Sequence, residues 1–203
     1  MALAKSQARA AILAARRSLS RQVRDREAAQ LAAHLVALLS PGTIACAYIP
    51  VGSEPGSVAL VEDAAARDVT VLLPVARNDD QGTPLPLRWG RYEPGRLVRA
   101  PFGLREPSPP WLPPEAIADA AVVLVPALAV DRDGARLGRG AGFYDRTLPL
   151  ADPAALLVAV VRDEELVERL PAEPHDVAMT HALTPQRGLV ALRRRTQSAT
   201  PWE

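Results

Sequence analysis

Hydrophobic and polar positions along the chain alternate between patterns typical of helices and patterns typical of strands. Residues 2–17 contain strong helix formers without Gly or Pro, and Ser20 is placed to cap a second helix that ends near Leu39. Short apolar runs rich in β-branched residues follow at residues 43–50, 69–75, 122–130 and 156–162. Runs of this kind predict strands buried on both faces of a sheet.

The order of these segments predicts the fold class. Residues 57–67 read as a helix between the first two strands, which indicates a parallel βαβ unit. We therefore expect one α/β domain over residues 1–203, a layered fold with a mainly parallel central sheet flanked by helices. The Pro- and Gly-rich residues 78–114 are expected to form an elaborated surface region with a hairpin strand at 87–92, and residues 193–203 a flexible tail.

Composition and charge exclude several classes of protein. Apolar residues make up 48% of the chain and charged residues 23%, the balance of an ordinary globular protein. Lys and Arg number 24 against 23 Asp and Glu, so no overall charge attracts nucleic acid or an anionic membrane. Cys46 is the only cysteine, and no apolar stretch approaches the roughly 20 residues of a membrane span. We expect a cytoplasmic protein that binds neither nucleic acid nor membranes.

A glycine-rich segment directly after a predicted strand carries the candidate chemistry. Residues 134–146 read GARLGRGAGFYDR, in which glycines at alternate positions permit positive φ and a close approach of the backbone to phosphate. Arg136 and Arg139 can grip phosphate oxygens, and Asp145 can hold a magnesium ion that phosphates share. The spacing matches neither the dinucleotide fingerprint nor the P-loop. The glycines alone fit either a tight loop or a phosphate site, and the charged residues favour the phosphate site.

Residues 125–148, VPALAVDRDGARLGRGAGFYDRTL, resemble the signature of the 5-formyltetrahydrofolate cyclo-ligase family. Further matching segments are the opening helix with Lys5, Arg9, Arg16, Leu19 and Ser20, then YIPVGSEPGS, FGLREP and PHDVAMTHALTP. The resemblance covers almost the entire chain. Departures from the family pattern are Ala141, where Lys or Gly is common, and the Pro-Gly pair after Glu54.

The resemblance implies an activity and a fold. It implies ATP- and Mg²⁺-dependent cyclisation of 5-formyltetrahydrofolate to 5,10-methenyltetrahydrofolate, with release of ADP and phosphate, by a monomer or homodimer. It also implies a layered fold like that of the sugar-phosphate isomerase and CoA-transferase group. Two alternatives stay open: a paralogue without the folate reaction, and a non-catalytic protein that binds nucleotides or phosphate.

The resemblance also implies roles for individual residues. Catalytic contacts with the transferring phosphate are expected from Arg136, Lys5 and Arg9. The nucleotide is expected to lie against Lys5, Arg9, Arg136, Leu137, Gly138, Arg139, Gly140, Ala141, Gly142, Phe143 and Tyr144. The folate is expected against Glu54, Ile49 and Phe102, and the metal against Asp145 and Asp176.

Each assigned residue also has a simpler structural explanation. Lys5 and Arg9 lie four residues apart and fit a solvated helix face as well as an anion site. Asp145 and Asp176 fit helix caps, and Glu54 fits a turn. His175, which stands before a predicted strand, is interpreted as structural, because the implied chemistry needs no base from it.

Overall fold

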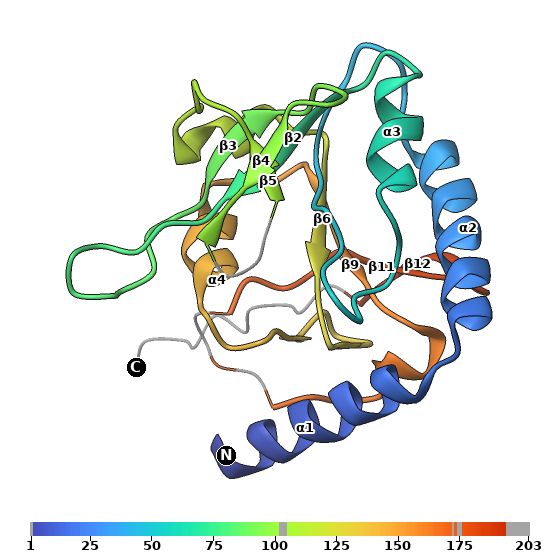
Figure 1. Ribbon diagram of the computed structural model, residues 1–203. Coiled ribbons are helices and arrows are strands. Elements are labelled where there is room, and N and C mark those ends of the chain that lie inside the picture. Colours follow the sequence, from blue (N-terminus) through green and yellow to red (C-terminus); the bar gives the residue numbers. More distant parts are fainter. Residues whose placement is uncertain (1, 102–104, 172, 174–175, 194–203) are drawn as a thin grey trace, which may run out of the picture.

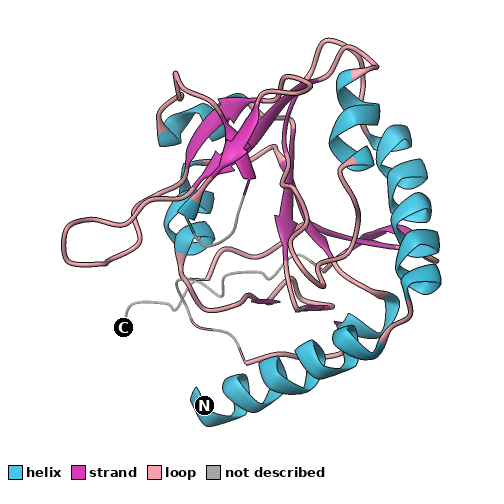
Figure 2. Cartoon of the chain, in the orientation of Figure 1, coloured by secondary structure: helices cyan, strands magenta, loops and turns pink. Residues whose placement is uncertain are grey.

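The protein is described by a computed structural model over residues 2–101, 105–171, 173 and 176–193 (Figures 1 and 2). The α-helices there are α1 (Ala2–Ser18), α2 (Arg21–Leu38), α3 (Ala59–Ala65) and α4 (Phe143–Thr147). The 3-10 helices are η2 (Pro114–Asp119), η3 (Leu148–Leu150) and η4 (Asp163–Glu165). The strands are β1 (Ile44–Cys46), β2 (Thr70–Val75), β3 (Arg88–Arg91), β4 (Leu97–Arg99), β5 (Arg105–Pro107), β6 (Val122–Pro126), β7 (Ala129–Asp131), β8 (Arg136–Leu137), β9 (Leu156–Val160), β10 (Leu166–Val167), β11 (His181–Thr184) and β12 (Gly188–Ala191).

A seven-stranded sheet forms the centre of the molecule, in the order β12-β11-β9-β6-β1-β2-β3. The strands from β11 to β2 pair in parallel, and the two edge strands, β12 and β3, pair antiparallel. The unit β1-α3-β2 is the parallel βαβ unit that the sequence predicts. The predicted α/β fold with a mainly parallel central sheet and flanking helices is confirmed.

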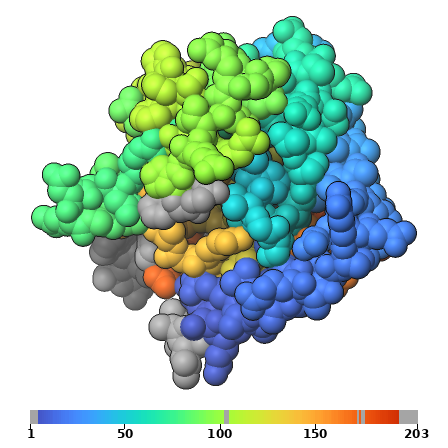
Figure 3. Space-filling model, viewed as in Figure 1, coloured from blue at the N-terminus to red at the C-terminus, as the bar shows by residue number. Residues whose placement is uncertain are grey.

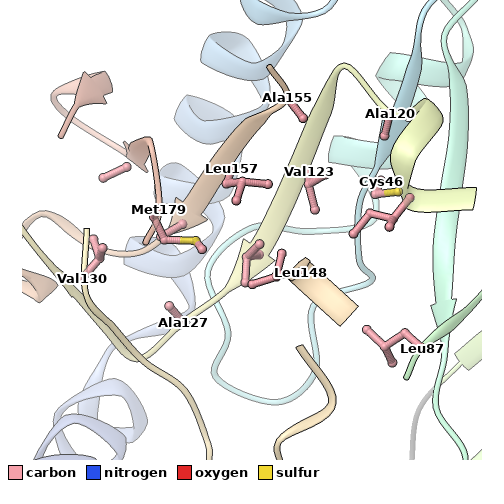
Figure 4. Close-up of a cluster of buried hydrophobic side chains, with 14 of the residues drawn as sticks. Cys46, Leu87, Ala120, Val123, Ala127, Val130, Leu148, Ala155, Leu157 and Met179 are labelled. Carbon is pink, nitrogen blue, oxygen red and sulfur yellow. The ribbon is translucent and has the colours of Figure 1, made fainter. Parts of the chain in front are cut away.

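Both faces of the central sheet are buried, which explains its uninterrupted apolar strands. Helices α2 and α3 lie side by side (Figure 1), and their Leu31 and Leu60 belong to one apolar cluster with Leu124 of β6. Val123 of β6 belongs to a second cluster, together with Leu148 (Figure 4). Successive residues of a strand point to opposite faces, so neighbours in β6 enter different clusters.

The prediction of one strand over residues 122–130 is wrong. β6 ends at Pro126, and the chain continues as β7 in a separate sheet of three strands, ordered β10-β7-β8. Proline has no N–H with which to extend a ladder, which favours a strand end at this point. The separation matters for function because β7 and β8 deliver the glycine-rich segment to the carboxyl ends of the central strands.

The Pro- and Gly-rich residues 78–114 contain more strand than the sequence predicts. β3 lies within the predicted hairpin strand and pairs antiparallel with β2. β4 and β5 form an additional two-stranded sheet, which the pattern of the sequence does not predict. The tail predicted at residues 193–203 lies outside the described residues, apart from its first position.

Helix α1 crosses one side of the molecule below the central sheet (Figure 1). Its Ala8, Ile12 and Leu13 pack against a small cluster formed by Leu128, Ala129 and Leu137 of the β7–β8 region. Helix α1 therefore binds to the segment that precedes the glycine loop. Within the described residues, no helix is both long enough and apolar enough to span a membrane.

Position 134, in the turn between β7 and β8, requires glycine. Its φ is +85°, and a Cβ there would collide with the backbone oxygen of Met179 and lie 3.1 Å from the Cβ of Ala178. Gly134→Ala is expected to lower the free energy of unfolding by about 1–2 kcal/mol, measured in urea. Gly138→Ala is the matched control, because a Cβ there meets nothing within 4 Å. Equal losses in the two variants would contradict this assignment.

Candidate active site

A cavity of about 440 Å³ lies at the carboxyl ends of β1, β2 and β6, the usual place for ligands in an open α/β sheet. Residues from these ends include Tyr48, Pro74 and Ala127. The remaining wall comes from the Glu54 loop, the glycine segment, α1 and residues between Asn78 and Arg105. Figure 3 shows a hollow on this face where segments far apart in the sequence meet.

A second hollow lies away from the strand ends, beside α3 and the start of β2. It has a volume of about 640 Å³, and its walls include Glu62, Arg91, Tyr92 and Glu93. Its charged lining residues are two acids, Glu62 and Glu93, and one base, Arg91, and the glycine segment does not reach it. The smaller cavity is therefore the candidate active site.

The glycine loop, defined as residues 138–142, connects β8 to α4 and lines this cavity. Gly140 and Gly142 have φ values of 96° and 82°, as the sequence predicts, whereas Gly138 does not adopt a positive φ. Within the described chain, no backbone N–H of the loop donates a hydrogen bond. Such a run of available donors can be offered to an anion.

Arg136 of β8 and Asp145 of α4 form an ion pair in the wall of the cavity. The Arg136 side chain is 8% exposed and the Asp145 side chain 50% exposed. The structure thus brings together the predicted phosphate-binding arginine and a predicted metal ligand. A phosphate and a metal ion bound here would meet both partners of the pair.

Glu54 lies in the wall of the same cavity and is joined to the glycine loop. Its Oε2 accepts a hydrogen bond from the backbone N–H of Val51 at 2.9 Å, and its Oε1 lies 3.1 Å from Nε of Arg139. Burial raises the pKa of Glu54 above its ordinary value, although the Val51 N–H and Arg139 oppose that rise. The environment therefore disfavours the charged carboxylate when no ligand shares it.

The raised pKa of Glu54 predicts a pH-dependent stability. A carboxyl group whose pKa is raised by folding stabilises the protein below its ordinary pKa of 4.5, and this contribution is lost as the pH rises through the folded pKa. Glu54→Gln is therefore expected to gain stability relative to wild type as the pH is raised from about 4.5 to 7. Urea midpoints of both proteins across this range test the prediction, and a constant difference would contradict it.

The polar side chains of Tyr48, Tyr144 and Arg16 also line the cavity. Tyr48 donates a hydrogen bond from its hydroxyl to the carbonyl oxygen of Pro55 at 3.1 Å. Burial raises the pKa of both Tyr48 and Tyr144, so both are neutral phenols at physiological pH. Arg16 of α1 also lines the cavity and forms an ion pair with Glu165 at 2.7 Å.

Of the two predicted cations of α1, Arg9 contacts the glycine loop and Lys5 contacts Glu173. Arg9 donates from Nε to the carbonyl oxygen of Gly138 at 2.9 Å, and its guanidinium lies 3.5 Å from the Cβ position of Gly140. Lys5 forms an ion pair with Glu173 at 3.0 Å. Neither is among the residues that line the cavity. Arg9 thus supports the loop directly, and contacts of both residues with phosphate stay predictions.

The other predicted site residues divide into three groups. Those in the wall of the cavity are Ile49, Glu54, Arg136, Gly138, Arg139, Gly140, Ala141, Gly142, Phe143, Tyr144 and Asp145. Leu137 and Asp176 are outside it, and Asp176 accepts a hydrogen bond from the backbone N–H of Glu173 at 2.8 Å. Phe102 and His175 lie outside the described residues. In the described chain, no three His, Cys, Asp or Glu side chains group to hold a metal.

Sequence reasoning assigned no site role to Tyr48, Arg105 or Arg16, which all line the cavity. A signal for Arg16 exists in the sequence. It follows Arg9 by seven residues and Lys5 by eleven, and such spacings place side chains along one stripe of a helix.

The sheet and the cavity together define an α/β protein whose candidate site combines a glycine loop with arginine side chains, a combination suited to an anion. The model of the 5-formyltetrahydrofolate cyclo-ligase family matches residues 2–185, and the chain belongs to this family. It is 64% identical over 189 residues to a 5-formyltetrahydrofolate cyclo-ligase of Mycolicibacterium smegmatis, covering 93% of this chain and 97% of that protein.

Two solved structures are similar over most of the chain. The 5,10-methenyltetrahydrofolate synthetase of Aquifex aeolicus gives a TM-score of 0.70 at 25% identity, covering 98% of this chain and 96% of that one. The 5,10-methenyltetrahydrofolate synthetase of Mycoplasma pneumoniae gives a TM-score of 0.66 at 22% identity, covering 86% and 94%. The second likeness supports the fold alone.

Proposed function

We propose that the protein catalyses the ATP-dependent cyclisation of 5-formyltetrahydrofolate to 5,10-methenyltetrahydrofolate, with release of ADP and phosphate. One observation carries the proposal: the glycine loop, Arg136 and Asp145 share a single cavity with Glu54. Membership of the cyclo-ligase family supports the same reaction. No observation favours a non-catalytic phosphate-binding protein.

The nucleotide phosphates are proposed to bind at the glycine loop. Its free backbone N–H groups can surround phosphate oxygens, and Arg136 and Arg139 add positive charge from the cavity wall. Lys5 and Arg9 are proposed to add charge from α1. Leu137 precedes the loop, and Phe143 and Tyr144 follow it as apolar and aromatic neighbours of the nucleotide.

The folate ring is proposed to bind on the Glu54 side of the cavity. Its amino-pyrimidine edge carries N–H donors, and the Glu54 carboxylate can accept hydrogen bonds from them. Nε of Arg139 lies 3.1 Å from this carboxylate. When the folate binds, Arg139 must either move away from Glu54 or share the carboxylate with the ring. Ile49 lines the same side, and Phe102 is proposed to complete the apolar wall.

The proposed reaction begins when the formyl oxygen on N5 attacks the γ-phosphorus of ATP. The bond from that phosphorus to the bridging oxygen breaks, and ADP leaves. N10 then attacks the activated formyl carbon, and the five-membered ring closes. Phosphate departs with the former formyl oxygen, and N10 releases its proton. The protein aligns the reactants and neutralises charge, so no protein nucleophile is needed.

Asp145 fits the role of a magnesium ligand. Its half-exposed carboxylate lies in the cavity beside the phosphate-binding loop, and magnesium commonly takes one or two protein carboxylates besides phosphate and water. A bound magnesium ion would neutralise negative charge on the transferring phosphoryl group. Asp176 is the second proposed ligand, although it would have to exchange its hydrogen bond with Glu173.

An absorbance assay tests the proposed function. Protein mixed with ATP, Mg²⁺ and 5-formyltetrahydrofolate is expected to produce the ultraviolet band of the methenyl product together with one ADP for each product formed. Removal of Mg²⁺ with a chelator is expected to abolish the band, and its restoration with Mg²⁺ is the control. Nucleotide binding without this product would instead favour a paralogue that lacks the folate reaction.

Three broader expectations are proposed with this function. A cytoplasmic location agrees with a chain whose single cysteine is buried in a central strand. A monomer or homodimer is the proposed assembly. Kinship with the sugar-phosphate isomerase and CoA-transferase group is supported by the mainly parallel sheet between helices.

A further inference from the structure

Two buried side-chain atoms of the described residues have no hydrogen-bond partner: Nη1 of Arg16 and Oη of Tyr144. Both residues line the candidate active site. Buried polar atoms in folded proteins are nearly always paired, because an unpaired one has lost its water without compensation. A ligand bound in this cavity can complete these hydrogen bonds.

Arg16 is held in one orientation by its other nitrogens. Nε donates to Oε1 of Glu165 and Nη2 to Oε2 of Glu165, each at 2.7 Å. Nη2 also donates to the carbonyl oxygen of Ala127 at 2.7 Å. The Arg16 side chain is 1% exposed. A planar guanidinium fixed in this way presents its remaining N–H groups in a set direction, so Nη1 is a preorganised donor.

Contacts of Arg162 join the Arg16–Glu165 pair to the Glu54 loop, because its Nη1 lies 3.9 Å from Oε1 of Glu165 and donates to the carbonyl oxygen of Ser53 at 3.2 Å. Burial raises the pKa of Glu54, and the positive charge of Arg16 is among the groups that oppose this rise. The same charge opposes the rise in the pKa of Tyr48, for which burial is again the largest cause. Arg136 and Asp145, in contrast, pair with each other at the phosphate loop. Arg16 therefore belongs with the part of the site proposed for the folate ring.

We propose that Arg16 donates a hydrogen bond from Nη1 to the 4-oxo oxygen of the folate ring while Glu54 accepts from the adjacent ring N–H groups. This assignment rests on the proposed function. A 2-amino-4-oxopyrimidine edge presents one acceptor followed by two donors, and a guanidinium beside a carboxylate is complementary to that order. Arg16 is then a specificity-determining residue that selects an oxo ring.

A change in the ligand tests this contact most directly. In the 4-thioxo analogue of 5-formyltetrahydrofolate, sulfur replaces the ring oxygen and accepts hydrogen bonds weakly, while the neighbouring N–H donors remain. Binding is measured by calorimetry without ATP. The wild-type protein is expected to bind the oxo ligand about tenfold or more tightly than the thioxo ligand, as the loss of a hydrogen bond to a charged donor predicts.

Two variants assign the preference to Arg16. Glu165→Gln keeps the guanidinium and serves as the control, while Arg16→Met combined with Glu165→Gln removes the donor without leaving an unpaired buried carboxylate. The control is expected to keep the oxo preference, and the combined variant to reduce the ratio of the two Kd values to about one. A merely structural role of Arg16 would weaken both ligands equally and leave the ratio unchanged.

Each outcome decides the proposal. Equal affinities for the two ligands in the wild-type protein overturn it, even if neither variant folds. A preference that persists in the combined variant overturns it as well. Formation of the methenyl product is measured separately on the wild-type protein. If the protein forms the product but binds both ligands equally, the proposed function stands and the role of Arg16 is wrong. If it does not bind the folate, the proposed function and the role of Arg16 are both wrong.

Discussion

Arg136→Ala is expected to lower kcat by about a hundredfold or more, measured as methenyl product formed per second at saturating substrates. Loss of a charge that is aligned with the transferring phosphoryl group has an effect of this order. The Arg136 side chain is 8% exposed and is oriented by its ion pair with Asp145, so its charge is preorganised beside the glycine loop. The effect should fall mainly on kcat, because the charge is needed most in the transition state.

Arg132→Ala is the matched control for this variant. Arg132 lies in the turn between β7 and β8, 3.8 Å from the carboxylate of Glu168, but it does not line the cavity. Its replacement is expected to leave kcat within about twofold of wild type, as changes away from a site usually do. Because Arg136→Ala also leaves Asp145 unpaired, its folding is checked by urea unfolding. Wild-type turnover in folded Arg136→Ala would remove Arg136 from the mechanism.

Glu54→Gln is expected to raise the Kd for 5-formyltetrahydrofolate by about tenfold to a hundredfold. A hydrogen bond to a charged acceptor contributes about 1.5–3 kcal/mol, and the amide of Gln also presents N–H groups to ring donors. The variant keeps the size of the side chain and can still accept from the N–H of Val51. Calorimetric titration with the folate in the absence of ATP measures the effect.

Nucleotide binding separates the role of Glu54 from a general disturbance of the cavity. Affinity for ATP and Mg²⁺ is expected to change little in Glu54→Gln, since the phosphates are assigned to the glycine loop. Glu62→Gln, on α3 and outside this cavity, is expected to leave folate affinity as it is in wild type. A variant that loses nucleotide affinity and keeps folate affinity would reverse the proposed arrangement.

The elements of the fold that could be predicted from sequence are those fixed by local signals. Ser20 caps α2 by accepting from the N–H of Val23, and the predicted boundary lies within one residue of the observed one. The buried strands were identifiable because both faces of the sheet are covered. The β4–β5 pair could not be predicted, because β4 is short and partly exposed. Residues 122–130 were predicted as a single strand because β6 and β7 are both apolar.

The site divides in the same way. Arg136, the glycines and Asp145 are neighbours along the chain, so their grouping could be predicted from the sequence alone. The pairing of Arg139 with Glu54 joins residues of two different loops and depends on the tertiary fold. Arg16 was matched to the family's opening helix without a site role, and its burial depends on Glu165, which lies 149 positions further along the chain. Its unpaired Nη1 becomes visible only when that contact is known.

The distance along the chain between α1 and its partners has a consequence for synthesis on the ribosome. Arg9 contacts Gly138, Arg16 contacts Glu165 and Lys5 contacts Glu173. Helix α1 is translated before all of these partners, so it cannot complete its contacts until residue 173 has been translated. Long-range contacts of this kind form late and slowly. A nascent chain arrested before residue 127 would therefore carry α1 undocked, with its apolar stripe accessible to chaperones.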